Sequence, residues 1–113
     1  MIYNLEERTL IFSENLIDFC KKCPKTILSV PVISQLVWSG TSIGANYREA
    51  NGALSKKDFK NKVYICKKES METKYWLRML SRALPGVIKE CRLLWKEAQE
   101  LTLIFSAITK KQS

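Results

Sequence analysis

Apolar side chains recur along most of this chain at alternating intervals of three and four residues, which is the spacing of one face of an α-helix. Four such stretches are separated by short segments that contain proline, glycine or serine. The pattern predicts helices over about residues 5–23, 29–52, 56–82 and 87–109. Short links between long helices favour antiparallel neighbours. We therefore expect an all-α protein in which residues 1–113 form a single domain, an up-down-up-down antiparallel four-helix bundle.

The second predicted helix is unusual because no charged residue occurs from Thr26 to Tyr47. Ser29 is expected as its N-cap, with Pro31 tolerated in the first turn. Gly40 and Gly44 lie four residues apart on one face, and a glycine costs a helix about 1 kcal/mol relative to alanine. Close approach of a neighbouring helix would explain both glycines. The seam of this helix is predicted to contain Val30, Ile33, Val37, Gly40, Gly44, Tyr47 and Asn51, flanked by Leu36, Ile43 and Leu54.

The uncharged run also has about the length of a membrane span. Serine, threonine, glutamine and asparagine interrupt it, and no aromatic belt with a basic flank follows, so we expect no span. The glycine-rich segment lacks the G-K-[ST] signature of a phosphate-binding loop and does not follow a strand. The N-terminus lacks the basic and apolar regions of a secretory signal, and we expect a cytoplasmic protein.

The chain contains four cysteines and no histidine. Cys20 and Cys23 form a C-x-x-C at the end of the first predicted helix, where the helix dipole disfavours a thiolate. Cys66 and Cys91 fall singly at core-type positions, whereas a four-cysteine zinc site would show two close pairs. Without histidine, the usual Ser-His and Cys-His nucleophiles are excluded. We therefore favour reduced core thiols over a metal or redox role, and we expect no metal, no cofactor and no catalytic residue.

Positive charge is concentrated in the C-terminal half. Residues 1–54 carry five basic and five acidic residues, whereas residues 55–113 carry fourteen basic and six acidic residues. The second half therefore holds the whole excess behind the net charge of +8. This asymmetry favours a polyanionic partner or an acidic patch on another chain.

The third predicted helix carries most of the candidate chemistry. At about 100° per residue, its basic and aromatic residues gather on one flank, and Asp58, Glu69 and Glu72 lie on the other. Lysine and arginine contact phosphates and tyrosine stacks on bases, so this flank predicts nucleic-acid binding. The candidate residues are Lys57, Lys60, Tyr64, Lys67, Lys68, Lys74, Tyr75 and Arg78. Two other interpretations remain open, namely a solvated face and a subunit interface in which a basic flank meets the acidic flank of the next copy.

Additional apolar residues lie beside the predicted seams, and a bundle of four helices cannot bury all of them. The surplus residues are Leu10 and Ile17 on the first helix, Trp76 on the third, and Leu93, Trp95 and Ile104 on the fourth. Exposed apolar surface of this extent indicates oligomerisation.

Three segments resemble a known bacterial family: WSGTSIGANYREA at Trp38–Ala50, SKKDF at Ser55–Phe59 and ETKYWL at Glu72–Leu77. The family comprises four-helix-bundle proteins encoded in intervening sequences of 23S ribosomal RNA genes. Its relatives include the accessory variability protein of diversity-generating retroelements, which assists a reverse transcriptase. The resemblance implies a homopentameric ring with a basic surface and a nucleic-acid-linked, non-enzymatic role. The family name reflects gene location and does not show ribosome binding.

Together these observations predict an oligomeric, non-enzymatic protein that binds RNA or DNA weakly and without sequence specificity through the basic flank of the third helix. The alternative is a protein-interaction scaffold that docks a partner protein such as a polymerase, without direct nucleic-acid contact.

Overall fold

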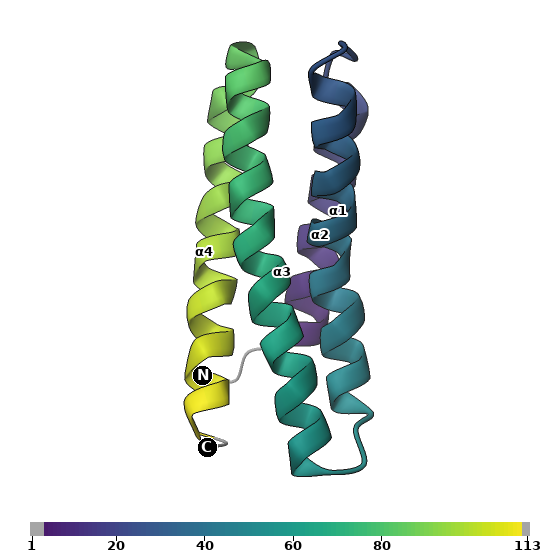
Figure 1. Cartoon of the computed structure of the whole chain (residues 1–113), viewed down its shortest axis with the longest axis vertical. Helices are drawn as coiled ribbons and strands as arrows, with labels where there is room; N and C mark the ends of the chain where they lie inside the picture. Colours follow the sequence, from purple (N-terminus) through teal and green to yellow (C-terminus); the bar gives the residue numbers. More distant parts are fainter. Residues whose placement is uncertain (1–3, 112–113) are drawn as a thin grey trace.

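The computed structural model describes residues 4–111, which form four long helices packed side by side (Figure 1). They are α1 (Leu5–Lys22), α2 (Ser29–Asn51), α3 (Lys56–Ala83) and α4 (Ile88–Lys111), with a 3-10 turn, η1 (Pro85–Val87), before α4. Each helix runs antiparallel to the one before it (Figure 1). The predicted all-α, up-down-up-down four-helix bundle is therefore confirmed, and its predicted helix limits agree with the structure to within about three residues.

Side-chain caps begin α1 and α3, whereas the predicted Ser29 cap of α2 is wrong. Ser55 Oγ accepts a hydrogen bond from the Asp58 backbone N–H at 3.0 Å and caps α3. Ser29, however, is the first residue of α2 and not its N-cap. Thr26 Oγ1 accepts from the Ser29 N–H, and Ser29 Oγ accepts from the Thr26 N–H. This reciprocal pair is a capping-box arrangement that starts the chain turning before α2 begins.

The core line of α2 differs from the predicted seam. Leu36, Ile43 and Ala50 are almost fully buried, although the first two were expected only as flanking residues. Val30, expected in the seam, is 52% exposed, and Leu54 is fully exposed beyond the end of the helix. The physical reason is that α2 packs against both α1 and α3. Its most buried line therefore lies between these two contacts, and the glycine stripe lies to the α1 side.

Gly40 and Gly44 allow α1 and α2 to pack closely. A Cβ atom on Gly40 would overlap Leu16 Cδ2, and a Cβ atom on Gly44 would lie 3.2 Å from Thr9 Oγ1. Leu16 and Thr9 are both fully buried. The predicted role of the two glycines in close helix packing is thus confirmed, and the neighbour is α1.

The four helix pairs do not pack equally. α3 lies along both α2 and α4, whereas α1 and α4 make sparse contact with each other. A two-bond polar contact between α1 and α4 joins Arg8 to Glu97, with N–O distances of 2.7 and 2.8 Å. The bundle is consequently closed on three sides and grooved on the fourth.

The four cysteines are buried free thiols. Burial raises the pKa of Cys20 to about 11 and the pKa values of Cys66 and Cys91 to about 12. Within residues 4–111, no cluster of three or more histidine, cysteine or acidic side chains is placed to hold a metal ion. Over the same residues, none of the helices combines the length and apolarity needed to cross a membrane.

Candidate nucleic-acid interface

The predicted basic flank of α3 lies beside α4 and extends outward from it. Lys74 fixes this orientation, because its Nζ donates to Gln99 Oε1 on α4 and lies 5.3 Å from the centroid of the Trp95 ring. Arg78, one turn further along α3, lines a hollow together with Arg92 of α4. The core residues Val63, Cys66 and Leu77 occupy the inner side of the same helix. The eight candidate residues therefore share the half of α3 that faces α4 and the exterior.

The cationic candidates differ in how firmly the protein holds them. Lys60 Nζ lies 5.8 Å from the centroid of the Tyr64 ring, and Lys68 approaches Glu69 at 4.0 Å. Lys57, Lys67 and Arg78 make no ion pair or hydrogen bond through their side chains to any residue between 4 and 111. These three side chains keep their charge available for an external anion.

The aromatic candidates Tyr64 and Tyr75 are 45% and 54% exposed. Tyr75 meets Trp76 edge to face, with ring centroids 4.9 Å apart. Each tyrosine therefore retains open ring surface on which a base could stack.

Sequence reasoning missed the contribution of α4 to this surface. Arg92, Lys96 and Lys110 follow the three-and-four spacing of the α4 stripe that contains Gln99, the acceptor for Lys74. All three are exposed. The sequence spacing of these three residues places them on one stripe of α4. Only the antiparallel packing of α4 against α3 brings that stripe next to the basic flank of α3. We call the eight candidate residues together with Arg92, Lys96 and Lys110 the basic face.

One part of the basic face is concave. A hollow of about 350 Å³ lies between α3 and α4. We call it the Arg78–Arg92 hollow, and its lining consists of Leu77, Arg78, Ser81, Ile88, Cys91, Arg92 and Trp95. Leu77 and Cys91 are buried and form an apolar floor, whereas both arginines are exposed at the rim. The Ser81 hydroxyl donates to the Arg78 carbonyl at 2.8 Å.

The opposite flank of α3, beside α2, has the opposite charge. Glu69 and Glu72 line a shallow depression with Trp38 of α2, and Trp38 is 69% exposed. Burial and the neighbouring Glu72 raise the pKa of Glu69. Further along, Lys62 Nζ pairs with Glu49 Oε1 at 2.7 Å and joins α3 to the end of α2. Glu69 and Glu72 therefore lie on one flank of α3 and the basic candidates on the other, apart from Lys62, whose charge this ion pair offsets.

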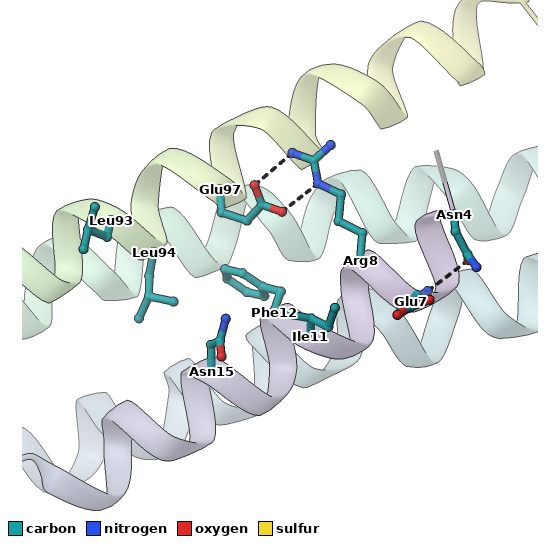
Figure 2. A pocket seen from close by; sticks show the side chains of 9 residues that line it. All are labelled: Asn4, Glu7, Arg8, Ile11, Phe12, Asn15, Leu93, Leu94 and Glu97. Atoms are coloured by element: carbon teal, nitrogen blue, oxygen red, sulfur yellow. Dashed lines mark hydrogen bonds and ion pairs between the residues drawn. The ribbon is translucent and has the colours of Figure 1, made fainter. Parts of the chain in front are cut away.

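A second surface feature is the groove between α1 and α4 (Figure 2). Two adjoining hollows of about 520 and 530 Å³ share Asn15, Leu93 and Leu94 in their linings. Ile11 and Phe12 lie on the α1 side, and the Arg8–Glu97 pair bridges the two helices at one end (Figure 2). We call this feature the α1–α4 groove.

The predicted surplus of apolar residues is only partly confirmed. Leu10, Ile17 and Leu93 are 45%, 41% and 69% exposed. Trp76, Trp95 and Ile104 are instead half-buried against the core. These longer side chains reach back from the flanks of α3 and α4 onto neighbouring core residues, which position on the helix face alone does not indicate.

The side chains at these surfaces differ in the chemistry that they offer. The sequence has no histidine. The four thiols are buried, and their pKa values are raised, so they remain protonated near neutral pH. A thiol in this form is a poor nucleophile and a poor metal ligand. The exposed arginine, lysine and tyrosine side chains of the basic face, by contrast, match phosphate and base recognition.

Comparisons with known proteins agree with this architecture. The family described as 23S rRNA-intervening sequence protein matches residues 4–107. The chain is also similar to the crystal structure of a protein of unknown function from the S23 ribosomal protein family of Bacteroides thetaiotaomicron. The TM-score is 0.82 at 31% sequence identity, covering 93% of this chain and 97% of that one. No curated protein matches the sequence.

Proposed function

We propose that this chain, which belongs to the 23S rRNA-intervening sequence protein family, is a non-enzymatic nucleic-acid-binding protein. It binds RNA or DNA weakly and without sequence specificity on the basic face. Lys57, Lys60, Lys67, Lys68, Lys74 and Arg78 supply phosphate contacts from α3, and Arg92, Lys96 and Lys110 extend them across α4. Tyr64 and Tyr75 supply stacking surface.

The observation that carries this proposal is the segregation of charge across α3. Glu69 and Glu72 of α3 lie toward α2, whereas Lys74 and Arg78 of α3 adjoin Gln99 and Arg92 of α4. A solvated face that served only to keep the protein in solution would have no need of this arrangement, because mixed charges do that equally well. Cationic side chains on two neighbouring helices instead suit a polyanion that passes over both.

A salt-titrated binding assay tests the proposal. Labelled single-stranded RNA and labelled duplex DNA should both be retained at low ionic strength, and retention should fall steeply as salt is added, because bound lysine and arginine displace counterions from the phosphates. If neither nucleic acid is retained at low salt, the proposal is wrong.

The α1–α4 groove favours a second function, that of a protein-interaction scaffold. Leu93 is 69% exposed and Ile11 is 46% exposed along it, so a protein surface that covered the groove would remove apolar area from water. The occupant is another copy of this chain, in a ring of five by resemblance to the family, or a partner protein such as a polymerase that docks without nucleic-acid contact.

The two functions separate experimentally. Light scattering at defined concentrations should report an oligomer, and Leu93→Asp should dissociate it while leaving helicity unchanged. Leu103→Asp is the matched control, because Leu103 is also on α4 and is 55% exposed, but does not line the groove. A monomer at every concentration would overturn the self-assembly proposal. A partner protein that survives nuclease and high salt in a pull-down, and is lost in Leu93→Asp, would support the scaffold.

A further inference from the structure

The Arg78–Arg92 hollow differs from the rest of the basic face in combining concavity, an apolar floor, two guanidinium groups and an indole. We propose that it is a subsite for one unpaired nucleotide of a single strand. The phosphate lies between Arg78 and Arg92, and the base lies against Trp95 and Ile88. This inference rests on the proposed nucleic-acid binding and adds to it a preferred form of the ligand.

The phosphate half of the subsite follows from the two arginines. They come from different helices, line the same hollow and are exposed. Neither guanidinium has an ion-pair or hydrogen-bond partner among residues 4–111. The two positive charges at the rim repel each other, and an anion bound between them attracts both. Guanidinium groups are also suited to phosphate because they donate two parallel hydrogen bonds to its oxygens.

The base-binding half of the subsite follows from the apolar and aromatic residues that line the hollow. Leu77 and Cys91 are buried beneath the hollow, and Ile88 is 37% exposed at its edge. Trp95 lines the hollow and carries Lys74 over its ring at 5.3 Å. Lys74 also donates a hydrogen bond to Gln99, which fixes the position of its ammonium group against the indole ring. An apolar floor with an aromatic side chain suits a nucleobase, which stacks on aromatic groups regardless of its identity.

Size and access determine which nucleic acid fits. A volume of about 350 Å³ is near the lower limit for small-molecule sites, which suits a single nucleotide rather than a larger ligand. The bases of a duplex are paired and stacked inside the helix and do not reach such a hollow without being flipped out at a cost of a few kcal/mol. The subsite therefore predicts that single strands bind more tightly than duplexes of the same length and composition.

The test compares two pairs of substitutions that remove the same charge. Arg78→Gln with Arg92→Gln empties the hollow of its cations, and Lys57→Gln with Lys96→Gln removes one cation from each helix outside it. Anisotropy of labelled, unstructured single-stranded RNA and of the matched RNA duplex is measured for both variants and the wild type. Folding is checked by thermal melting, and all four positions are exposed.

We expect the arginine pair to lose about tenfold more affinity for the single strand than the lysine pair does, since two charge-assisted hydrogen-bonding groups are removed from one phosphate. For the duplex, both pairs should lose the same modest amount. Trp95→Leu should reduce single-strand binding and leave duplex binding unchanged.

Two results would overturn the subsite. Equal losses for the two pairs on the single strand, or a wild type that binds duplex as tightly as single strand, would show that the basic face acts only as diffuse charge. In that case the proposed nucleic-acid binding would still stand. A wild type that binds neither RNA would remove the subsite, and it would also remove the proposed nucleic-acid binding if duplex DNA is not bound either.

Discussion

The interface between α1 and α2, which we call the seam, and the basic face are built from different kinds of residue. The seam uses Gly40 and Gly44 to bring two backbones together, and it has no charge along the α2 run from Thr26 to Tyr47. The basic face uses long cationic side chains on α3 and α4, most of them solvated. In the seam, the volume of a side chain matters, whereas on the basic face its charge matters. Changes to the first should therefore lower stability, and changes to the second should lower binding.

The largest effect should come from filling the seam. Gly40→Val places three carbon atoms where a Cβ alone would overlap Leu16 Cδ2, and Leu16 is fully buried. We expect a loss of about 3 kcal/mol in the free energy of unfolding, measured by urea denaturation. The control is Gly86→Ala, since a Cβ on Gly86 meets no atom within 4 Å and should change stability by less than about 0.5 kcal/mol. A Gly40→Val protein as stable as the wild type would contradict the packing role of the glycine.

A smaller effect should come from the α1–α4 side, where a polar bridge joins the helices. Glu97→Gln removes the charge that receives both hydrogen bonds from Arg8, and both side chains are largely shielded from solvent. We expect a loss of about 1 kcal/mol in the free energy of unfolding. Glu100→Gln is the control on the same helix and should be neutral, because Glu100 is exposed. Equal effects of the two substitutions would show that the bridge contributes nothing specific.

The smallest effect concerns the interior thiols and depends on pH. Burial raises the pKa of Cys66 and Cys91 from 9.0 to about 12, so the folded state holds their protons when the unfolded state has begun to lose them. Stability is therefore lost as pH rises through the unfolded thiol pKa. At that pH the loss is about 0.4 kcal/mol per thiol, because half of the unfolded thiols are ionised.

Melting curves in reducing buffer between neutral pH and about pH 9 measure this loss. A Cys66→Ala, Cys91→Ala protein should be less stable at neutral pH but should lose less stability as pH rises. The other ionisable groups titrate in both proteins, so they contribute equally to the two pH profiles. Parallel pH profiles for the two proteins would contradict the assignment of this loss of stability to Cys66 and Cys91.

Much of the fold could be predicted from the sequence because helix periodicity and turn residues are local signals. The limits of the helices and the close packing required by Gly40 follow from residues within a few positions in the sequence. The error in the core line of α2 arose because that helix meets two partners at once. Leu36 and Ile43 form the core line of α2 because α1 and α3 flank it, and periodicity alone cannot divide one helix between two neighbours.

The candidate site shows the same limit. The basic flank of α3 could be predicted from one helix, because its residues share one stripe. The participation of Arg92 and Lys96 could not, since it depends on how α4 lies against α3. The engagement of Lys74 by Gln99 and Trp95 is likewise a property of that pairing. The Arg78–Arg92 hollow therefore becomes visible only in the assembled bundle.

The assignment of nucleic-acid binding to the basic face is tested most directly by the salt dependence of RNA binding in two variants of equal charge. One variant carries Lys57→Gln, Lys67→Gln and Lys96→Gln on the basic face, and the other carries Lys21→Gln, Lys22→Gln and Arg48→Gln on α1 and α2. We predict that the magnitude of the slope of log affinity against log salt for single-stranded RNA decreases by about 2 in the first variant and stays unchanged in the second. Equal slopes in the two variants would contradict the assignment of nucleic-acid binding to α3 and α4.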